Sequence, residues 1–355
     1  MVRFFSFILL LGLLVSCSSN YKGTALGPDG TIVVFADSST VNLTRTALNE
    51  TLQKNIKSLP QPQPIFDLEF HKAYEFLDLK NRAYHLFLAS LTDSGATSRL
   101  VRSMLSKEAY NKAASGEQVV LPVRNLWNDK QLTIFIIADS LKNLDKVIRS
   151  NEKDLIYLFN DLTLTRTQIA MFRSHSQPEV SRRIYDKLGF TIGMQHDYVV
   201  VKDTLNPNFL YIKRTQVDVD RWLWVYWWKE ENPRFDDQLK FMAIRDSITK
   251  LYIQGDDSLG SYVEVARDSK NQPFLLEQKS VDFKGIYAVE TRGVWRLNDF
   301  SMGGPFINYT FYNDSLKQMF MIDGSVLAPR YEKKRDFLRE MEVIAKTISW
   351  KKPEE

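Results

Sequence analysis

The chain has almost no cysteine. Its single cysteine, Cys17, follows an apolar run at residues 4–14 and the residues Val15 and Ser16. One thiol cannot form a disulfide within the chain, so a disulfide framework is excluded. The apolar run is too short for a stable transmembrane span, and no later run is long enough for one. We therefore interpret residues 1–16 as a lipoprotein signal peptide.

Cys17 has the position of the acylated cysteine in a bacterial lipoprotein signal. The alternative is an incidental cysteine at the end of the apolar run. We favour lipidation, because no other cysteine is present in the chain. Acyl chains such as palmitate contribute roughly 0.8 kcal/mol per buried methylene to membrane binding. Ser18 follows the cysteine instead of Asp, which favours the outer membrane, at its periplasmic face or at the cell surface, and residues 17–29 are predicted to form a polar tether.

Histidine and the common cofactor motifs are scarce as well. The four histidines are scattered, without the paired spacing that indicates a zinc site. The sequence contains no dinucleotide fingerprint, no glycine-rich phosphate loop and no GxSxG nucleophile motif. We therefore predict no metal site and no cofactor.

Neither sign of charge is in large excess. The formal net charge of +4 falls to +3 when Arg3 is removed with residues 1–16. Basic and acidic residues are interspersed, and no basic stripe is present. Nucleic acid is therefore not expected as a partner.

The pattern of apolar residues predicts an α+β fold. Apolar runs at 30–36, 83–91 and 132–138 predict buried strands, and helical spacing predicts helices over 41–58 and from 141 onwards. After residue 190, short strands alternate with turn residues. The expected architecture has two lobes of mixed or antiparallel sheet, each packed with helices. These are an N-terminal α/β lobe at 30–165 and a C-terminal α+β lobe at 166–350, which ends in a long helix over 331–349.

Four short segments contain strong local signals. Residues 60–64 read PQPQP, which favours a stiff extended crossover over a PxxP-type ligand. Residues 281–294 have the composition of one long strand. Gly303-Gly304-Pro305 predicts a tight bend, and Asp323-Gly324-Ser325 predicts a tight turn after a strand.

The densest combination of charged, aromatic and conformationally special residues lies at 287–306. Glu290 and Arg292 alternate and therefore share one face of a strand, and Trp295 and Asp299 follow them. Glu290 and Asp299 could serve a glycosidase, which requires two carboxylates roughly 5–10 Å apart. An ion pair between Glu290 and Arg292 is the simpler interpretation. We select Glu290, Arg292, Trp295 and Asp299 as candidate binding residues and assign no catalytic residue.

Two further features are candidates for binding. A strand at 221–228 would carry Trp222 and Trp224 on one face, where aromatic rings can stack sugars, peptides or acyl chains. Its other face is also apolar, so burial on both faces is the favoured interpretation. Arg330 is predicted at the start of the last helix, where the helix dipole disfavours a cation, and this indicates an anionic partner.

Several segments together resemble one family. They are the cysteine-terminated signal, GTIVVFAD, SLPQPQPIFDL, the tryptophan-rich strand, GDDSLGSY, ETRGVWRLNDFSMGGPF and DGSVLAPRYEKKRDFLREME. In order and spacing they resemble the uncharacterised (domain-of-unknown-function) lipoproteins of Bacteroidota, over nearly the whole mature chain. The resemblance implies an exported, lipid-anchored α+β protein without assigned activity or cofactor.

Two classes of function remain open from the sequence. The first is a lipid-anchored envelope protein that binds a protein or glycan partner or has a structural role. The alternative is an envelope hydrolase, acting on a glycan or peptide, that uses a carboxylate as acid or base. An enzyme would require a concave, partly desolvated carboxylate with a raised pKa.

Overall fold

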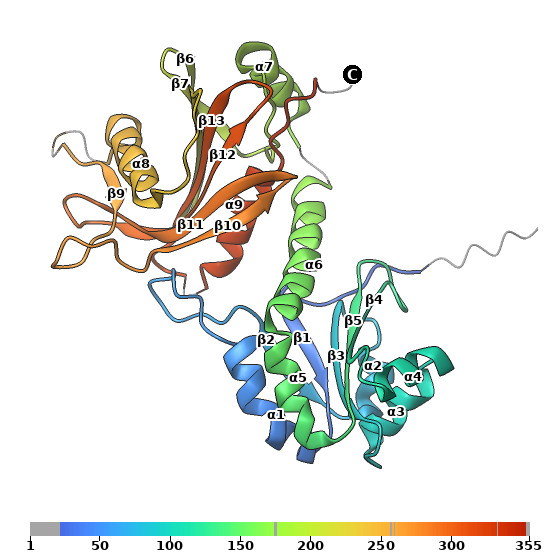
Figure 1. Ribbon diagram of the computed structural model, residues 1–355. Helices are drawn as coiled ribbons and strands as arrows, with labels where there is room; N and C mark the ends of the chain where they lie inside the picture. The colour runs from blue at the N-terminus through green and yellow to red at the C-terminus, as the bar shows by residue number, and fades with distance from the viewer. Residues whose placement is uncertain (1–21, 174–175, 256–257, 259, 332, 353–355) are drawn as a thin grey trace, which may run out of the picture.

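A computed structural model describes residues 22–173, 176–255, 258, 260–331 and 333–352. Cys17 and the predicted signal peptide lie outside these residues. The described chain is α+β, as predicted, and contains two separate sheets (Figure 1). None of its described helices is both long enough and apolar enough to cross a membrane.

The first sheet is mixed and has five strands in the described part of the chain. Its order is β2-β1-β3-β5-β4, and all neighbours are parallel except β4 and β5. Continuous apolar runs form its central strands, because helices cover both faces. The strands are β1 (Thr31–Phe35), β2 (Asp67–His71), β3 (Tyr84–Ser90), β4 (Val120–Arg124) and β5 (Leu132–Ala138).

Helices form a layer on each side of the first sheet. One layer consists of α1 (Ser38–Thr51), α5 (Leu144–Ser150) and α6 (Glu152–Phe172), and it buries residues such as Leu48 and Phe159. The other consists of α2 (Phe76–Leu79), α3 (Ala96–Met104) and α4 (Lys107–Ala114), with the 3₁₀ turn η1 (Ala73–Glu75) beside it. A second 3₁₀ turn, η2 (Leu141–Asn143), leads into α5.

The second sheet is antiparallel, and eight strands belong to it within the described residues. Its main order is β10-β11-β12-β13-β8-β7-β6, and β9 pairs with β11. The strands are β6 (Val199–Leu205), β7 (Asn208–Gln216), β8 (Val219–Lys229), β9 (Val263–Val265), β10 (Glu277–Phe283), β11 (Ile286–Leu297), β12 (Gly303–Asn313) and β13 (Gln318–Leu327).

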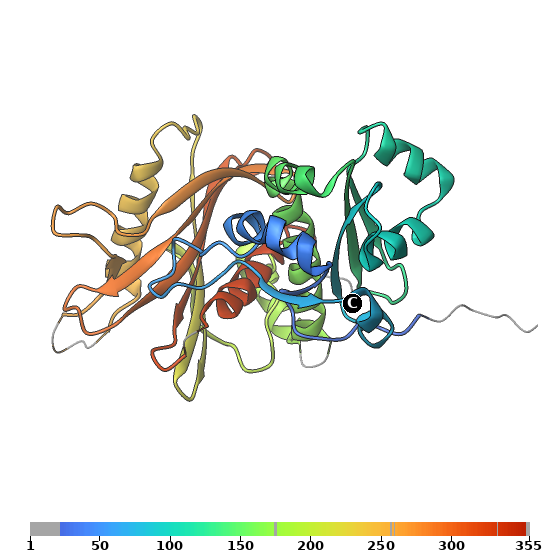
Figure 2. The same ribbon diagram turned by 90° about the horizontal axis from the view of Figure 1, so that it is seen from below.

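The second sheet is also covered on both faces. Helices α7 (Pro178–Leu188) and α9 (Arg335–Lys346) pack on one face, where Leu338 and Met341 are buried. Helix α8 (Gln238–Tyr252) packs on the other face through Phe241 and Met242. Helices α6 and α9 contact one another, and Figure 2 shows α9 (red) and α1 (blue) between the two sheets.

The prediction of a long C-terminal helix is wrong. Helix α9 begins at Arg335, because the Gln63 side-chain oxygen accepts hydrogen bonds from the backbone N–H groups of Lys334 at 2.7 Å and Arg335 at 2.9 Å. It ends at Lys346, after which Ser349 forms a bridge with Thr191. Contacts with segments distant in sequence therefore shorten this helix at both ends.

Three local predictions in the second sheet are also wrong. Gly303-Gly304-Pro305 begins β12 and is not a bend, and Asp323-Gly324-Ser325 lies inside β13 and is not a turn. The segment 281–294 contains a hairpin, in which Phe283 pairs with Ile286 across Lys284 and Gly285, instead of one strand. Gly285 has a φ of 83°, a left-handed conformation that glycine adopts easily.

Candidate functional site

Glu290 and Arg292 lie on the face of β11 that contacts α9. The Arg292 Nε donates to Glu290 Oε1 at 2.7 Å, and its Nη2 donates to Glu342 Oε2 on α9 at 2.7 Å. The Tyr309 hydroxyl donates to Glu290 Oε2 at 3.0 Å. Lys279 lies 3.1 Å from Glu290 and completes a closed network around its carboxylate. Both oxygens of Glu290 therefore already have partners within the protein.

The charges around Glu290 keep it ionised. Burial alone would raise its pKa, but the positive charges of Arg292 and Lys279 outweigh this effect and lower the pKa to about 2. The positive charges of Arg292 and Lys346 likewise outweigh the effect of burial on Glu342, whose pKa is lowered as well. A carboxylic acid with such a low pKa is not available as a proton donor near neutral pH.

This network predicts a loss of stability in acid. The folded-state pKa of Glu290 lies below its ordinary value of 4.5, so its contribution is present above pH 4.5 and is lost as the pH falls towards 2. In urea unfolding experiments we expect Glu290 to account for on the order of 2 kcal/mol of the fall in unfolding free energy between pH 5 and 2.5. The unfolding free energy should depend less steeply on pH in Glu290→Gln. It should be unchanged in Glu117→Gln at an exposed position, and equal slopes in all three proteins would refute the prediction.

The candidate tryptophans form part of the core on the opposite face of the second sheet. Trp222, Trp224 and Trp295 are 5%, 0% and 2% exposed, and they pack in the same cluster with residues of α8. The rings of Trp222 and Trp295 meet edge to face, with centroids 5.0 Å apart. The Trp295 indole N–H donates to the backbone oxygen of Val326 at 3.2 Å. These three rings stabilise the fold and do not line a groove.

Asp299 and Arg330 lie apart from both clusters. Asp299 is exposed in the loop after β11, where its carboxylate accepts hydrogen bonds from the N–H and hydroxyl of Ser301. Arg330 lies five residues before α9, so its predicted place at the helix start is wrong. Its guanidinium is largely exposed and lies 3.0 Å from Asp218. The structure therefore does not bring the predicted residues together into one site.

A buried ion pair in the second sheet was not predicted. Arg245 of α8 donates to both oxygens of Asp323, at 2.7 and 3.2 Å, and both side chains are fully buried. Its guanidinium lies 3.9 Å from the centre of the Phe306 ring. Asn308 also donates to Asp323, at 3.1 Å. The Asp-Gly pair suggested a turn, and no local sequence signal indicates that the partner of Asp323 lies 78 positions away.

The two sheets are joined where α9 meets the segment after α1. Arg335 donates to the backbone oxygen of Pro64 at 2.9 Å and to Asp67 at 3.0 Å. Arg339 donates to the backbone oxygen of Ile65 at 2.7 Å. Both arginines are nearly buried, so these bonds are sheltered from water. Helix α9 is thus fixed to both parts of the molecule.

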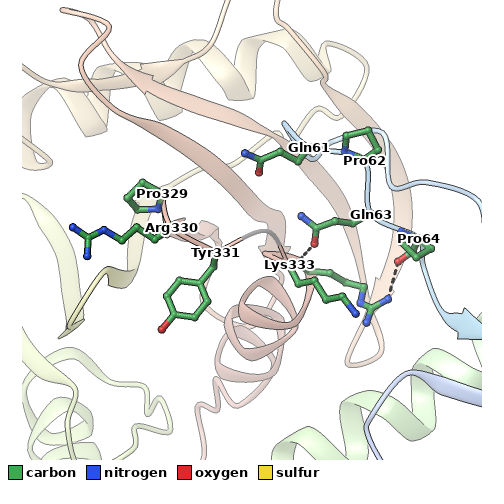
Figure 3. Close-up of a pocket in the computed structure, with 9 residues that line it drawn as sticks. Gln61, Pro62, Gln63, Pro64, Pro329, Arg330, Tyr331 and Lys333 are labelled. Atoms are coloured by element: carbon green, nitrogen blue, oxygen red, sulfur yellow. Dashed lines mark hydrogen bonds between the residues drawn. The ribbon is translucent and has the colours of Figure 1, made fainter.

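A hollow of about 470 Å³ opens beside this joint, and we call it the junction pocket. Figure 3 shows residues 61–64 on one side and residues 329–331 on the other. Its lining residues come from segments more than 260 positions apart in sequence: Gln61, Pro62, Gln63, Pro64, Pro329, Arg330, Tyr331, Lys333 and Arg335. The PQPQP segment is therefore a pocket wall as well as a crossover.

The junction pocket is lined by cations. Arg330, Lys333 and Arg335 are among its described lining residues, and none of those residues is acidic. The guanidinium of Arg335 already donates hydrogen bonds to the backbone oxygen of Pro64 and to Asp67. The side chains of Arg330 and Lys333 are 77% and 66% exposed, and their nearest carboxylates are 3.0 and 3.6 Å away. Exposed pairs of this kind contribute little to stability and can exchange for another anion.

Glu340 on α9 is the carboxylate nearest to the requirements of an acid catalyst. It lines a second hollow of about 390 Å³ beside α6, and burial raises its pKa, although Arg221 and Arg214 oppose this effect. Its Oε2 accepts a short hydrogen bond from Arg221, and Arg214 lies 4.0 Å away. Glu340 is therefore also held by partners within the protein. Among the described residues, no group of three or more His, Cys, Asp or Glu could hold a metal ion.

Two parts of the chain match family models. Residues 25–172 match a domain of unknown function (DUF8532), and residues 177–347 match another domain of unknown function (DUF4837). No curated protein matches the chain. The resemblance to an uncharacterised domain family is thereby confirmed. The two matched segments follow one another and together span most of the chain.

Proposed function

We propose that this protein is a lipid-anchored protein of the outer membrane that binds an acidic segment of an envelope partner protein in the junction pocket. Its anchor would be the acylated Cys17, seven positions before Thr24, which forms a bridge with Asp129 of the first domain. The observation that carries the proposal is the set of exposed cations on the walls of the junction pocket.

The chemistry of the pocket favours a peptide with carboxylates. Arg330 and Lys333 offer charge-assisted hydrogen bonds to carboxylates, and Arg330 can bind one with two parallel bonds. Pro62, Pro64 and Pro329 provide stiff apolar surface, and Tyr331 is 44% exposed beside them. Prolines lose little conformational entropy when a ligand binds, so this wall is already organised for a partner.

The geometry gives less support to the alternative, an envelope hydrolase. Glu290 is enclosed by its partners and has a lowered pKa. Asp299 is exposed, and its hydrogen bonds with Ser301 lower its pKa. Glu340 has a raised pKa but is bonded to Arg221. None of these three carboxylates is both free and poised to donate a proton.

Charge reversal in the junction pocket tests the proposal. After mild crosslinking of native outer membranes, we expect the full chain to recover one acidic protein in stoichiometric amount. Arg330→Glu with Lys333→Glu should reduce the recovery at least tenfold, because both cations would become repulsive. Lys142→Glu with Lys270→Glu makes the same change in charge at exposed positions elsewhere and should behave as wild type.

Three results would refute the proposal. They are the absence of a specific partner, equal recovery by both double variants, and recovery of a glycan instead of a protein. Cys17→Ala provides the separate test of the anchor in the same experiment. This variant should leave the membrane fraction, and its retention there would contradict lipidation at Cys17.

A further inference from the structure

Another large hollow lies at the end of β8, beside the start of α8, and we call it the β8 pocket. Its volume is about 530 Å³. It combines aromatic and aliphatic side chains with charged and amide side chains: Trp228, Glu230, Asn232, Arg234, Asp236, Asp237, Lys240, Phe241, Ile244 and Met319. Helix α8 lies against this face of the sheet (Figure 1). The pocket shares no lining residue with the junction pocket.

The floor of the β8 pocket continues the row of aromatic residues on β8. Trp222 and Trp224 are buried, but Tyr226 and Trp228 are only partly buried. The rings of Tyr226 and Trp228 are stacked, with centroids 5.6 Å apart and planes 28° apart. Trp228 is opposite Met319 on β13. The row of rings is thus covered at one end and accessible at the other.

Further aromatic rings extend this surface. Phe235, in the loop before α8, meets Tyr287 edge to face with centroids 5.1 Å apart. Phe235 also contacts Phe241, a lining residue of the β8 pocket, at 5.8 Å. Tyr287 is 52% exposed. At this end of the sheet, partly buried and exposed aromatic rings therefore lie next to polar groups.

Part of the polar rim of the β8 pocket has no partner among the residues that the structure describes. The side chains of Arg234, Asp236 and Lys240 line one hollow, yet the described residues provide none of them with an ion pair or hydrogen bond. Asn232 is exposed beside them. Asp237 instead caps α8 by accepting from the backbone N–H of Lys240 at 3.1 Å. Donors and acceptors are therefore available to a ligand without breaking any bond in the fold.

We propose that the β8 pocket binds a neutral saccharide. A sugar ring has a flat face of C–H groups that can pack on Trp228, and hydroxyl groups around its edge that can bond with Asn232, Arg234 and Asp236. The lining contains three carboxylates and two cations, so it favours neither a polyanion nor a polycation. A purely apolar ligand would remove these charged groups from water without compensating bonds.

Calorimetric titration of the full chain in lipid nanodiscs tests this site. The probes are two neutral hexasaccharides, cellohexaose and chitohexaose, with an oligogalacturonate hexamer as the acidic comparison. We expect at least one neutral hexasaccharide to bind, and more tightly than the acidic hexamer. Arg234→Ala with Asp236→Ala should weaken this binding at least tenfold, and because both side chains are exposed and unpaired the variant should fold normally.

Two further variants define the site. Lys107→Ala with Glu117→Ala removes one charge of each sign at exposed positions outside the pocket and should bind as wild type. Trp228→Leu keeps an apolar side chain but removes the ring, and it should weaken binding while Arg234 and Asp236 remain. The proposal is overturned if neither neutral hexasaccharide binds, if the acidic hexamer binds more tightly, or if the Arg234/Asp236 variant binds as wild type.

Discussion

Replacing Asp323 with asparagine is expected to lower the free energy of unfolding by about 3–5 kcal/mol, which is the usual cost of removing one partner from a buried ion pair. The substitution would leave Arg245 fully buried, with the Asp246 carboxylate at 3.9 Å as its remaining counter-charge. The shape of the side chain changes little, so the loss would report the missing charge and not a cavity. Urea unfolding at neutral pH provides the measurement.

Asp314→Asn is the matched control for this prediction. Asp314 pairs with Lys317 at 2.8 Å, but both side chains are exposed. Loss of this exposed ion pair should change the free energy of unfolding by less than about 1 kcal/mol. In a second test, Arg245→Met added to Asp323→Asn should recover part of the stability, because the unpaired charge is then gone. A similar effect for Asp323→Asn and Asp314→Asn would show that the buried pair contributes no special stability.

Substituting Gly304 with alanine is expected to cost about 3 kcal/mol, at the upper end for overpacking of a tightly packed core. A Cβ atom at this position would lie 2.0 Å from the backbone oxygen of Val326. That oxygen belongs to the neighbouring strand β13, and it accepts the hydrogen bond from the Trp295 indole. Relief of the clash would therefore require the two strands to separate and this bond to lengthen.

Gly23→Ala is the control for Gly304→Ala. Its added Cβ would lie 3.7 Å from the nearest side chain, which is an ordinary contact distance. Thermal unfolding should show a clear decrease in Tm for Gly304→Ala and almost none for Gly23→Ala. A shift in the fluorescence of the buried tryptophans should accompany the decrease. Equal Tm values for Gly304→Ala and wild type would contradict the predicted close approach of β12 and β13.

The sequence was sufficient to predict elements whose own residues determine their structure. The apolar run at 132–138 coincides with β5, because a strand covered on both faces needs no polar alternation. The two apolar faces predicted for 221–228 belong to two different cores in the structure, one with Trp224 and the other with Leu223. Both predictions depended only on the period of apolar residues.

The sequence was misleading where a distant segment overrides a local preference. Asp323-Gly324 has turn chemistry, yet Asp323 is needed to neutralise Arg245, and Gly324 leaves space for α9. A Cβ on Gly324 would lie 2.7 Å from that of Met341. Gly304 likewise permits close approach of strands and does not form a bend. Local patterns cannot reveal such needs, because the partners lie far away in sequence.

The same limit applies to the candidate site. Glu290 and Arg292 were correctly assigned to one strand face, but Trp295 has the opposite parity on β11 and faces another core. Arg330 is the one predicted residue that lines the junction pocket. Its neighbours there, Pro62 and Pro64, were predicted to form a crossover. Only the docking of α9 on residues 63–65 brings these groups together.

The position of Gln63 at the start of α9 has a thermodynamic consequence for the whole chain. Its hydrogen bond with Arg335 closes a loop of 272 positions, and the entropy cost of closure grows only slowly with length. The two walls of the junction pocket belong to different domains. A ligand that bridges residues 61–64 and 329–333 would therefore stabilise both domains together. At a concentration 100 times its Kd, such a ligand would add about 2.7 kcal/mol to a shared unfolding transition. In calorimetry, the single unfolding peak would then move to a higher temperature as a whole. A ligand that binds one domain only would shift the unfolding of that domain and leave the unfolding of the other domain at its original temperature.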